Sequence, residues 1–250
     1  MPFKRNLIYF VCPFKNNNEW RLNIRELMKY MHIFNNKKIV VVGQGDKIFD
    51  ISKVRKEFND NSIVFYAMPN DKNLGEVLPF KKMMEKVYSL DPCEFTFYAH
   101  AKGVSPKYQN RTNRKYMSNI RIWRNTMYYF CLRDPNLINR ILSDFSCCGC
   151  YTNFKNIGNN SCKWFFAGTY FWFNNKRVFS RDDWEIDMCD RYSVEAYLGC
   201  RFSLEESYNL FVMHPHLAIP ELSKEDWNDI LPDFYKSIDF EHGLSKEKMI

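Results

Sequence analysis

The first hundred residues alternate between short apolar runs and stretches in which apolar residues recur at helical spacing. The apolar runs at 6–12, 38–42, 62–67 and 95–99 predict strands. Between them, the stretches at 18–34, 51–58 and 80–90 have the spacing of amphipathic helices. Short buried strands that alternate with helices predict a Rossmann-related α/β fold, with a mostly parallel central sheet and helices on both faces.

The second half of the chain has a less regular pattern. It predicts helices at 118–130 and 136–145, a strand at 147–151, a long aromatic strand at 164–173 and a helix that starts within 191–199. Beyond residue 215 the pattern weakens into proline-containing loops and charged residues. We therefore predict one domain at 1–215 and a C-terminal extension at 216–250 that packs on this domain or trails from it.

Composition is that of a folded protein with a sizeable core. Of the 250 residues, 46% are hydrophobic and 17% are aromatic, which excludes a disordered chain. No stretch approaches the roughly 18–20 apolar residues that span a bilayer. The apolar run at 7–12 is too short for the core of a signal peptide. We therefore expect a cytoplasmic protein.

The formal net charge of +7 favours an anionic partner: nucleic acid, a membrane surface or a phosphorylated small molecule. The basic residues are dispersed, and their densest stretch lies at 102–124. Nine cysteines include Cys147, Cys148 and Cys150, but adjacent cysteines do not have the spaced pairs of a structural zinc site. We expect these thiols to pack in the core, and we predict no metal site.

The most informative stretch is EFTFYAHAKGVS at 94–105, where a predicted buried strand ends in His100 and Lys102. Residues two apart on a strand point to the same side. A lysine there neutralises a diphosphate as a point charge, and an imidazole accepts a proton or donates to an oxyanion. Arg121 and Arg124 would assist phosphate binding. The alternative is a solvated lysine, a half-buried histidine and the polar face of a helix.

Polar residues also follow the other strands of the first half, where parallel-sheet proteins bind ligands. Pro13 and Lys15 lie between the first strand and a helix N-terminus, which is suited to an anion. Asp46 follows the second strand, where a carboxylate binds ribose hydroxyls or a base edge. Asn70 and Glu76 follow the third strand. Ordinary strand-to-helix turns explain each of these loops equally well.

The aromatic segment FAGTYFWF at 166–173 has two interpretations. Sugar rings stack on aromatic side chains, so Gly168, Thr169, Tyr170 and Trp172 would form a wall of an acceptor site. A packed interior strand is the alternative, and both interpretations can hold for alternate residues. Downstream, Glu195 and the acidic group that includes Asp183 supply the carboxylates for base catalysis.

Taken in order, several segments resemble a group of bacterial and viral GT-A-type glycosyltransferases that serve polysaccharide, O-antigen or capsule assembly. The resemblance covers about residues 6–211 and rests on NEWRLNIRELMKYMHIFNNKKIVVV, PNDKNLGEVLPFKKMMEKV, YAHAKGVS, IRIWRNTMYYF, FAGTYFWFNNKRV and RYSVEAYLG. GT-A enzymes usually carry an Asp-x-Asp motif that holds a divalent ion after the central strand. Here that place reads His100-Ala101-Lys102.

The resemblance implies a hexosyltransferase-type enzyme that moves a sugar from a UDP-, GDP- or dTDP-sugar to a glycan or lipid-linked glycan, in surface polysaccharide or glycoprotein glycan synthesis. It implies Glu195 as catalytic base, with Asp183 behind it, and it implies that His100 or the segment at 111–124 assists Lys102 at the diphosphate. The implied donor-site residues are Lys102, Pro13, Lys15, Asp46, Asn70, Glu76, Arg121 and Arg124, and the implied acceptor-site residues are Gly168, Thr169, Tyr170 and Trp172.

The departure from Asp-x-Asp predicts a metal-independent enzyme, in which Lys102 does part of the ion's work and no cofactor is required. Manganese or magnesium bound through other residues stays open, as does peripheral attachment to the inner face of a membrane. We expect no nucleic-acid partner. Two other classes remain as alternatives: a nucleic-acid-binding protein and a non-catalytic carbohydrate-binding relative.

Overall fold

The computed structural model describes residues 2–14, 17–44, 51–71, 73–102, 114–154, 157–158, 161–187 and 190–211. Two predicted donor-site residues, Lys15 and Asp46, lie outside the described residues, and so does the predicted extension at 216–250. No helix within the described ranges is long and apolar enough to cross a bilayer.

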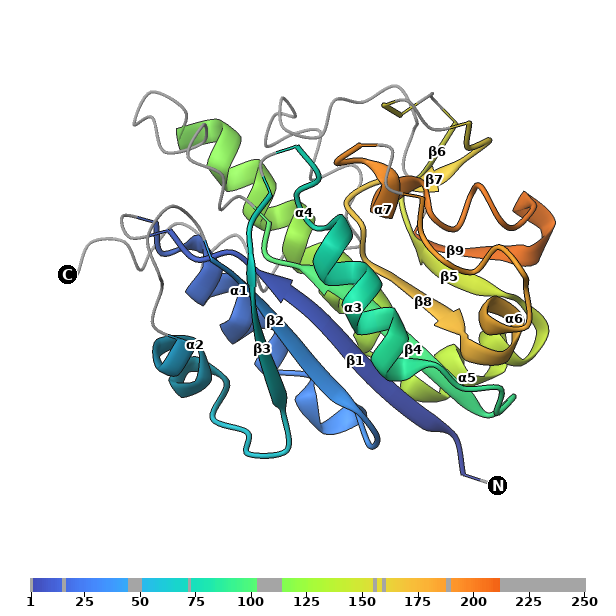
Figure 1. Ribbon diagram of the computed structural model, residues 1–250, viewed down its shortest axis with the longest axis horizontal. Helices are drawn as coiled ribbons and strands as arrows, with labels where there is room; N and C mark the ends of the chain where they lie inside the picture. The colour runs from blue at the N-terminus through green and yellow to red at the C-terminus, as the bar shows by residue number, and fades with distance from the viewer. Residues whose placement is uncertain are drawn as a thin grey trace.

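A seven-stranded sheet forms the centre of the molecule, in the order β3-β2-β1-β4-β8-β5-β9 (Figure 1). Strands β3, β2, β1 and β4 are parallel to one another, β8 is antiparallel to both of its neighbours, and β9 is parallel to β5. The strands are β1 Lys4–Val11, β2 Lys38–Gln44, β3 Val64–Pro69, β4 Glu94–His100, β5 Cys147–Cys150, β8 Phe171–Asn174 and β9 Ser207–Phe211. The predicted mostly parallel α/β sheet is confirmed.

Helices cover both faces of this sheet, which is why its central strands consist of nearly continuous apolar residues. Along β1, Leu7, Tyr9 and Val11 belong to one hydrophobic cluster, whereas Ile8 and Phe10 belong to the other. The first cluster includes residues of α1 Glu19–Met28, α2 Ile51–Phe58, α4 Arg114–Leu132 and α5 Pro135–Asp144. The second includes residues of α3 Val77–Val87, α6 Asn175–Phe179 and α7 Ser193–Ala196.

Smaller elements complete the described chain. The 3-10 helices are η1 Met31–Ile33 and η4 Leu204–Glu206, and a two-stranded sheet pairs β6 Thr152–Asn153 with β7 Phe165–Phe166. The helix predicted at 18–34 thus ends at Met28, and the helix predicted within 191–199 has only four residues, Ser193–Ala196.

The long aromatic strand predicted at 164–173 is wrong: the segment forms two strands, β7 and β8, that belong to different sheets. The break lies at Gly168 and Thr169, whose φ angles are 101° and 64°. Both angles are incompatible with an extended strand. Gly168 also packs so closely that a Cβ atom would lie 2.7 Å from the Met127 sulfur.

The strand order reverses at β1, and this reversal positions the candidate site. From β1 the chain adds β2 and β3 on one side and then returns to place β4 on the other side. In open α/β sheets, ligands bind beyond the carboxyl ends of the strands at such a reversal. His100 is the last residue of β4, and Lys102 follows two positions later.

Candidate functional site

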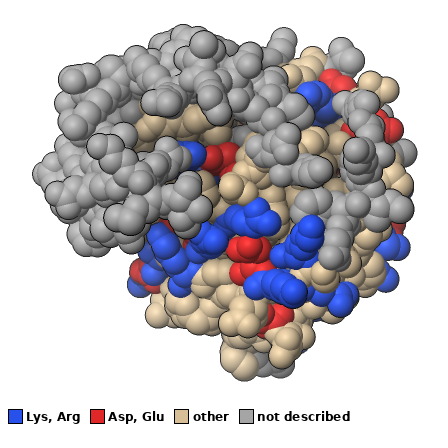
Figure 2. Space-filling view, turned by 90° about the vertical axis from the view of Figure 1, so that its left-hand side faces the viewer, with Lys and Arg blue, Asp and Glu red and all other residues tan. Residues whose placement is uncertain are grey.

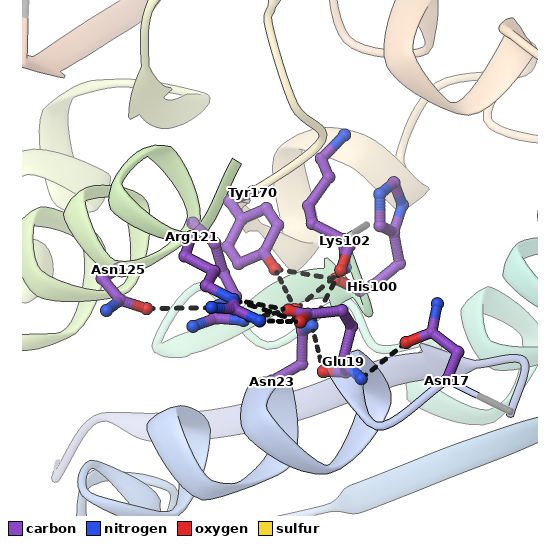
Figure 3. Close-up of polar contacts among 9 residues, drawn as sticks. Asn17, Glu19, Asn23, His100, Lys102, Arg121, Asn125 and Tyr170 are labelled. Atoms are coloured by element: carbon purple, nitrogen blue, oxygen red, sulfur yellow. Dashed lines mark hydrogen bonds and ion pairs between the residues drawn. The ribbon is translucent and has the colours of Figure 1, made fainter. Parts of the chain in front are cut away.

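The ammonium group of Lys102 occupies a half-buried position beyond the end of β4 (Figure 3). Its Nζ atom lies over the Trp123 indole, 4.9 Å from the ring centroid. Burial is the largest influence on its pKa and lowers it below the ordinary value of 10.5, and the positive charge of Arg191 adds to this effect. The carboxylates of Glu195 and Glu76 attract the ammonium and offset part of the lowering. Lys102 is thus a desolvated cation that faces two acidic side chains.

Glu195 is held by the same turn that interrupts the aromatic segment. Its Oε1 atom accepts a hydrogen bond of 2.8 Å from the backbone N–H of Gly168. Glu195 itself comes from the four-residue helix α7 and is half-buried. Gly168 lies at the break between β7 and β8, outside the paired residues of both strands. The break in the strand therefore provides the donor that orients Glu195.

On the other side of Lys102, Glu76 forms an ion pair with His100. The Glu76 Oε2 atom contacts His100 Nδ1 and also accepts a hydrogen bond of 2.7 Å from the Tyr98 hydroxyl. Burial by itself raises the pKa of the Glu76 carboxyl, but the charge and hydrogen bond of His100, the Tyr98 hydroxyl and Lys102 together lower it below its usual value. Glu76 is therefore ionised at neutral pH.

Asn23, a fully buried residue of α1, binds the backbone of Lys102 with both ends of its side-chain amide. Its Oδ1 atom accepts from the Lys102 N–H at 2.9 Å, and its Nδ2 atom donates to the Lys102 carbonyl at 2.9 Å. The same Nδ2 donates to the Glu19 carbonyl at 2.7 Å. Two residues before Lys102, the His100 carbonyl accepts a hydrogen bond of 2.7 Å from the Tyr170 hydroxyl. Asn23 and Tyr170 thereby fix the backbone of the chain at the end of β4.

Glu19 joins α1 to two arginines of α4. Arg121 approaches it with Nη2 at 2.6 Å and Nε at 3.1 Å from Oε1. The buried Arg124 lies 3.5 Å from Oε2, and its Nε donates to Asn125 at 2.9 Å. Both arginines were predicted to bind donor phosphate. The structure gives both a carboxylate partner, and Arg124 is buried within the protein.

The remaining predicted residues are distributed unevenly around this site. Pro13 is buried just past β1, and the backbone N–H of Asn70 donates to the Gln44 carbonyl at 2.7 Å, so the loops after β1, β2 and β3 lie at the same end of the sheet as His100. Asp183 instead forms an exposed ion pair with Arg181, at 2.7 Å. It is held at the surface by Arg181, two residues away in the chain, whose hydrogen bonds and charge lower the pKa of the Asp183 carboxyl.

The predicted acceptor wall is mostly interior. Trp172 is fully buried, and its indole N–H donates to the Cys131 carbonyl at 2.8 Å. Tyr170 and Thr169 are each 1% exposed. These residues are core and turn residues, so stacking of a sugar on Trp172 is not compatible with this structure. Of the proposed wall, Gly168 takes part in the site through its amide.

Four contributors to the site were not among the sequence candidates: Glu19, Asn23, Tyr98 and Trp123. Glu19 and Asn23 are four residues apart on a helix, which places two polar side chains next to the apolar stripe. That spacing could have predicted that both side chains contribute to one polar site. Tyr98 gave no such signal, because a tyrosine in an apolar strand reads as core.

Within the described ranges, no group of three or more His, Cys, Asp or Glu side chains is arranged to hold a metal ion. Cys147, Cys148 and Cys150 are buried, and burial raises the pKa of each thiol. The expectation that they pack in the core is confirmed.

Comparison with known proteins found similarity among solved structures. No protein-family model matches the sequence, and no curated protein sequence matches it. Among solved structures, the chain is similar to the galactosyltransferase LgtC in complex with donor and acceptor sugar analogs. That similarity covers 76% of this chain and 68% of the LgtC chain, with 10% sequence identity and a TM-score of 0.37.

Proposed function

We propose that this chain is a nucleotide-sugar-dependent glycosyltransferase. It moves a hexose from a UDP-, GDP- or dTDP-sugar to a hydroxyl of a glycan or lipid-linked glycan, in surface polysaccharide or glycoprotein glycan synthesis. The observation that carries the proposal is the desolvated ammonium of Lys102, held at the point where the strand order reverses. The ordered sequence motifs that resemble GT-A-type glycosyltransferases support the same conclusion.

In this proposal Lys102 stabilises the diphosphate leaving group. As the bond between the sugar and the diphosphate breaks, negative charge grows on the phosphate oxygens. A cation that is already in position, in a site with little water, stabilises that charge more strongly than it would in bulk water. Two hydrogen bonds between the Asn23 amide and the Lys102 backbone fix the residue, and the Trp123 indole packs against its ammonium, before the donor binds.

The residues at the end of β4 do not fit the divalent ion that a GT-A-type fold implies. A protonated lysine has no lone pair to offer a cation, and His100 and Glu76 bind each other. We therefore propose a metal-independent reaction in which no step passes through an ion.

Glu195 is the proposed base at the acceptor hydroxyl. The acceptor oxygen attacks the anomeric carbon and its proton passes to Glu195, while the bond to the diphosphate breaks and its electron pair stays on the phosphate oxygen. This assignment applies to a reaction that inverts the anomeric centre. A base in this position contributes about 10²–10⁴-fold to such a step. The hydrogen bond from Gly168 to Oε1 fixes the carboxylate and leaves Oε2 for the hydroxyl.

The test begins with binding and then measures turnover. Saturation-transfer NMR against UDP-, GDP- and dTDP-sugars identifies the donor, and donor hydrolysis or transfer is then measured with and without EDTA. We expect turnover to survive EDTA, and to fall at least about 100-fold in Lys102→Ala and in Glu195→Gln. Lys29→Ala, which removes an exposed lysine paired with Glu26, is the matched control and keeps full activity.

Three results would contradict this proposal in different ways. Absence of binding to every donor overturns the function. Loss of turnover on chelation, restored by manganese, overturns the role of Lys102 as the substitute for an ion. Near-normal turnover in Glu195→Gln removes Glu195 as the base.

A nucleic-acid-binding protein receives less support from the charge distribution. Lys and Arg side chains lie among acidic ones on the face shown in Figure 2. Among the basic residues of the first forty, Arg21 and Arg25 form ion pairs with Glu57, and Lys38 forms one with Asp60. Nucleic-acid binding would show a steep fall in affinity with salt and no requirement for a nucleotide sugar.

A further inference from the structure

We propose that His100 acts as the acid that donates to the leaving diphosphate, and that Glu76 is the positioning residue that holds its ring through Nδ1. This inference rests on the proposed function and assigns a second group to the leaving-group side of the same site. It concerns three side chains, Glu76, Tyr98 and His100, which we call the acid triad.

The loop before α3 is folded so that it presents Glu76 to His100. Asp71 Oδ1 accepts the backbone N–H groups of Asn73 at 2.7 Å and Leu74 at 3.0 Å, and the N–H of Gly75 donates to the Asp71 carbonyl at 2.8 Å. Gly75 has a φ angle of +57°, which glycine adopts without strain. The chain therefore reverses just before Glu76.

The Glu76 carboxylate does not cap the helix that follows it. It is the N-cap residue of α3, where an acidic side chain usually accepts a backbone N–H of the first turn, but its side chain makes no such bond. One of those N–H groups does not exist, because the third helical residue is Pro79. The carboxylate instead accepts from the Tyr98 hydroxyl and contacts His100 Nδ1.

The Glu76 carboxylate holds the His100 ring through its Nδ1 atom. The ionised carboxylate holds a proton on Nδ1, and the Tyr98 hydroxyl donates to the same carboxylate oxygen, Oε2. The side chains of His100 and Glu76 are 15% and 13% exposed, so water screens the pair weakly. The second ring nitrogen, Nε2, is then available as a donor.

His100 and Lys102 are directed to the same region. Figure 3 shows that both side chains rise from the end of β4 toward the same side, as their spacing of two residues predicts. Lys102 also feels the charge of Glu76. A diphosphate placed on the ammonium therefore meets Nε2 of His100. When the bond to the sugar breaks, the proton on Nε2 passes to the phosphate oxygen that keeps the electron pair.

The groups that titrate near His100 set the conditions of the test. They are Glu76 on α3, Tyr98 on β4, Tyr170 before β8, and Lys102, with Glu195 and Arg191 facing Lys102. Burial raises the pKa of Tyr98 and Tyr170 well above 10, so neither titrates near neutral pH. Lys102 is the other group whose titration would produce an alkaline limb, and it must be separated from His100.

The experiment compares pH profiles of donor turnover in wild type, Glu76→Gln, Tyr98→Phe and Lys102→Arg. We expect a bell-shaped profile whose alkaline limb reports His100 and moves about 1 pH unit or more toward acid in Glu76→Gln. Tyr98→Phe shifts it less in the same direction. In Lys102→Arg turnover is lower but the limb stays in place, because arginine does not titrate in this range. A Glu76→Gln profile that differs from wild type only in height, or a limb that disappears in Lys102→Arg, overturns the proposal.

A measurement without turnover separates this proposal from the proposed function. The His100 imidazole nitrogens are followed by NMR, assigned with His100→Gln, while inorganic pyrophosphate is added to the apoprotein. We expect pyrophosphate to shift the Nε2 resonance and to increase the imidazolium fraction, and both effects weaken in Tyr98→Phe. If no donor turns over but pyrophosphate shifts His100, the glycosyltransferase proposal fails and the anion contact stands. If donors turn over but His100 is unaffected by pyrophosphate, the acid role fails alone.

Discussion

Polar groups near Lys102 differ between the two faces of the sheet. On the α1 face, Asn23 binds the Lys102 backbone and is joined to a network of charged side chains. On the α3 face, acidic groups lie near the Lys102 ammonium and near His100. The first set, Glu19, Asn23, Arg121 and Arg124, makes direct hydrogen bonds and ion pairs across α1, α4 and the end of β4. We call it the backbone clamp. The second set, Glu76, His100 and Glu195, is half-buried and lies around the Lys102 charge, which burial disfavours.

The difference between the two sets separates support from chemistry. Glu19, Asn23 and Arg124 are at most 8% exposed, and the hydrogen bonds they make stabilise the fold. The charges around the Lys102 ammonium carry a cost of burial, which is the usual price of a preorganised site. We therefore expect substitutions in the backbone clamp to reduce stability first, and substitutions on the α3 face to change activity and pH dependence first.

The largest effect is expected for Glu19→Ala. It leaves the buried Arg124 without its carboxylate, and loss of one partner of a buried ion pair typically costs about 3–5 kcal/mol. Urea denaturation measures the loss. The matched control is Glu26→Ala on the same helix, which removes a pair with the exposed Lys29 and should cost no more than about 1 kcal/mol. Equal losses in the two variants would show that the clamp does not support the fold.

Asn23→Leu is expected to cost about 2–3 kcal/mol, because it leaves the N–H and carbonyl of Lys102 without their buried partners. Asn23→Asp keeps the acceptor for the N–H but loses both donated bonds, so it should reduce stability as well. Turnover should fall in both variants under conditions where each is fully folded, since the ammonium is no longer fixed. Normal turnover in folded Asn23→Leu would argue that Lys102 needs no clamp.

Lys102→Met should act in the opposite direction on stability. The pKa of Lys102 is lowered in the folded protein, so the unfolded chain holds its proton more tightly and the charge disfavours folding at neutral pH. Removing the charge should raise the melting temperature by about 2 °C while abolishing turnover. The stability of wild type should approach that of the variant as pH rises toward the lysine pKa. A lower melting temperature would show that the ammonium is a net stabiliser.

The smallest effect is the acid dependence of stability due to Glu76. Its pKa is depressed in the folded protein, so its contribution is present above the unfolded pKa of about 4.3 and is lost as pH falls through the folded pKa. The stability difference between wild type and Glu76→Gln should therefore shrink between about pH 5 and pH 3. Urea denaturation at several pH values checks this. A difference that does not change with pH would contradict an ionised Glu76.

The parallel half of the sheet could be predicted because strands and helices there follow from the local pattern of apolar and polar residues. Continuous apolar runs predicted the four parallel strands to within a few residues, and the polar residues at the end of β4 indicated the place to look. The strand order itself was not predicted. His100, Lys102 and Glu76 were named from their positions after strands, and the structure brings them together. The roles assigned to them remain predictions.

The remainder depended on contacts that no local pattern carries. Arg121 and Arg124 fit a phosphate site equally well until α1 places Glu19 against them. The aromatic strand continued through Gly168 in the prediction, although an isolated glycine in a strand is a known sign of interruption. Trp172 was ambiguous because sugar-stacking and core tryptophans have the same neighbours in sequence.

The sequence distances spanned by the bonds to Lys102 have a consequence for folding. Asn23 binds a residue 79 positions away, and Tyr170 of the same cluster lies 147 positions from Asn23. Contacts of such high sequence separation require most of the loop-closure entropy to be lost before they form. Because β1 and β4 pair across a similar sequence distance, we expect the site to form together with the central strand pair and not from local contacts alone.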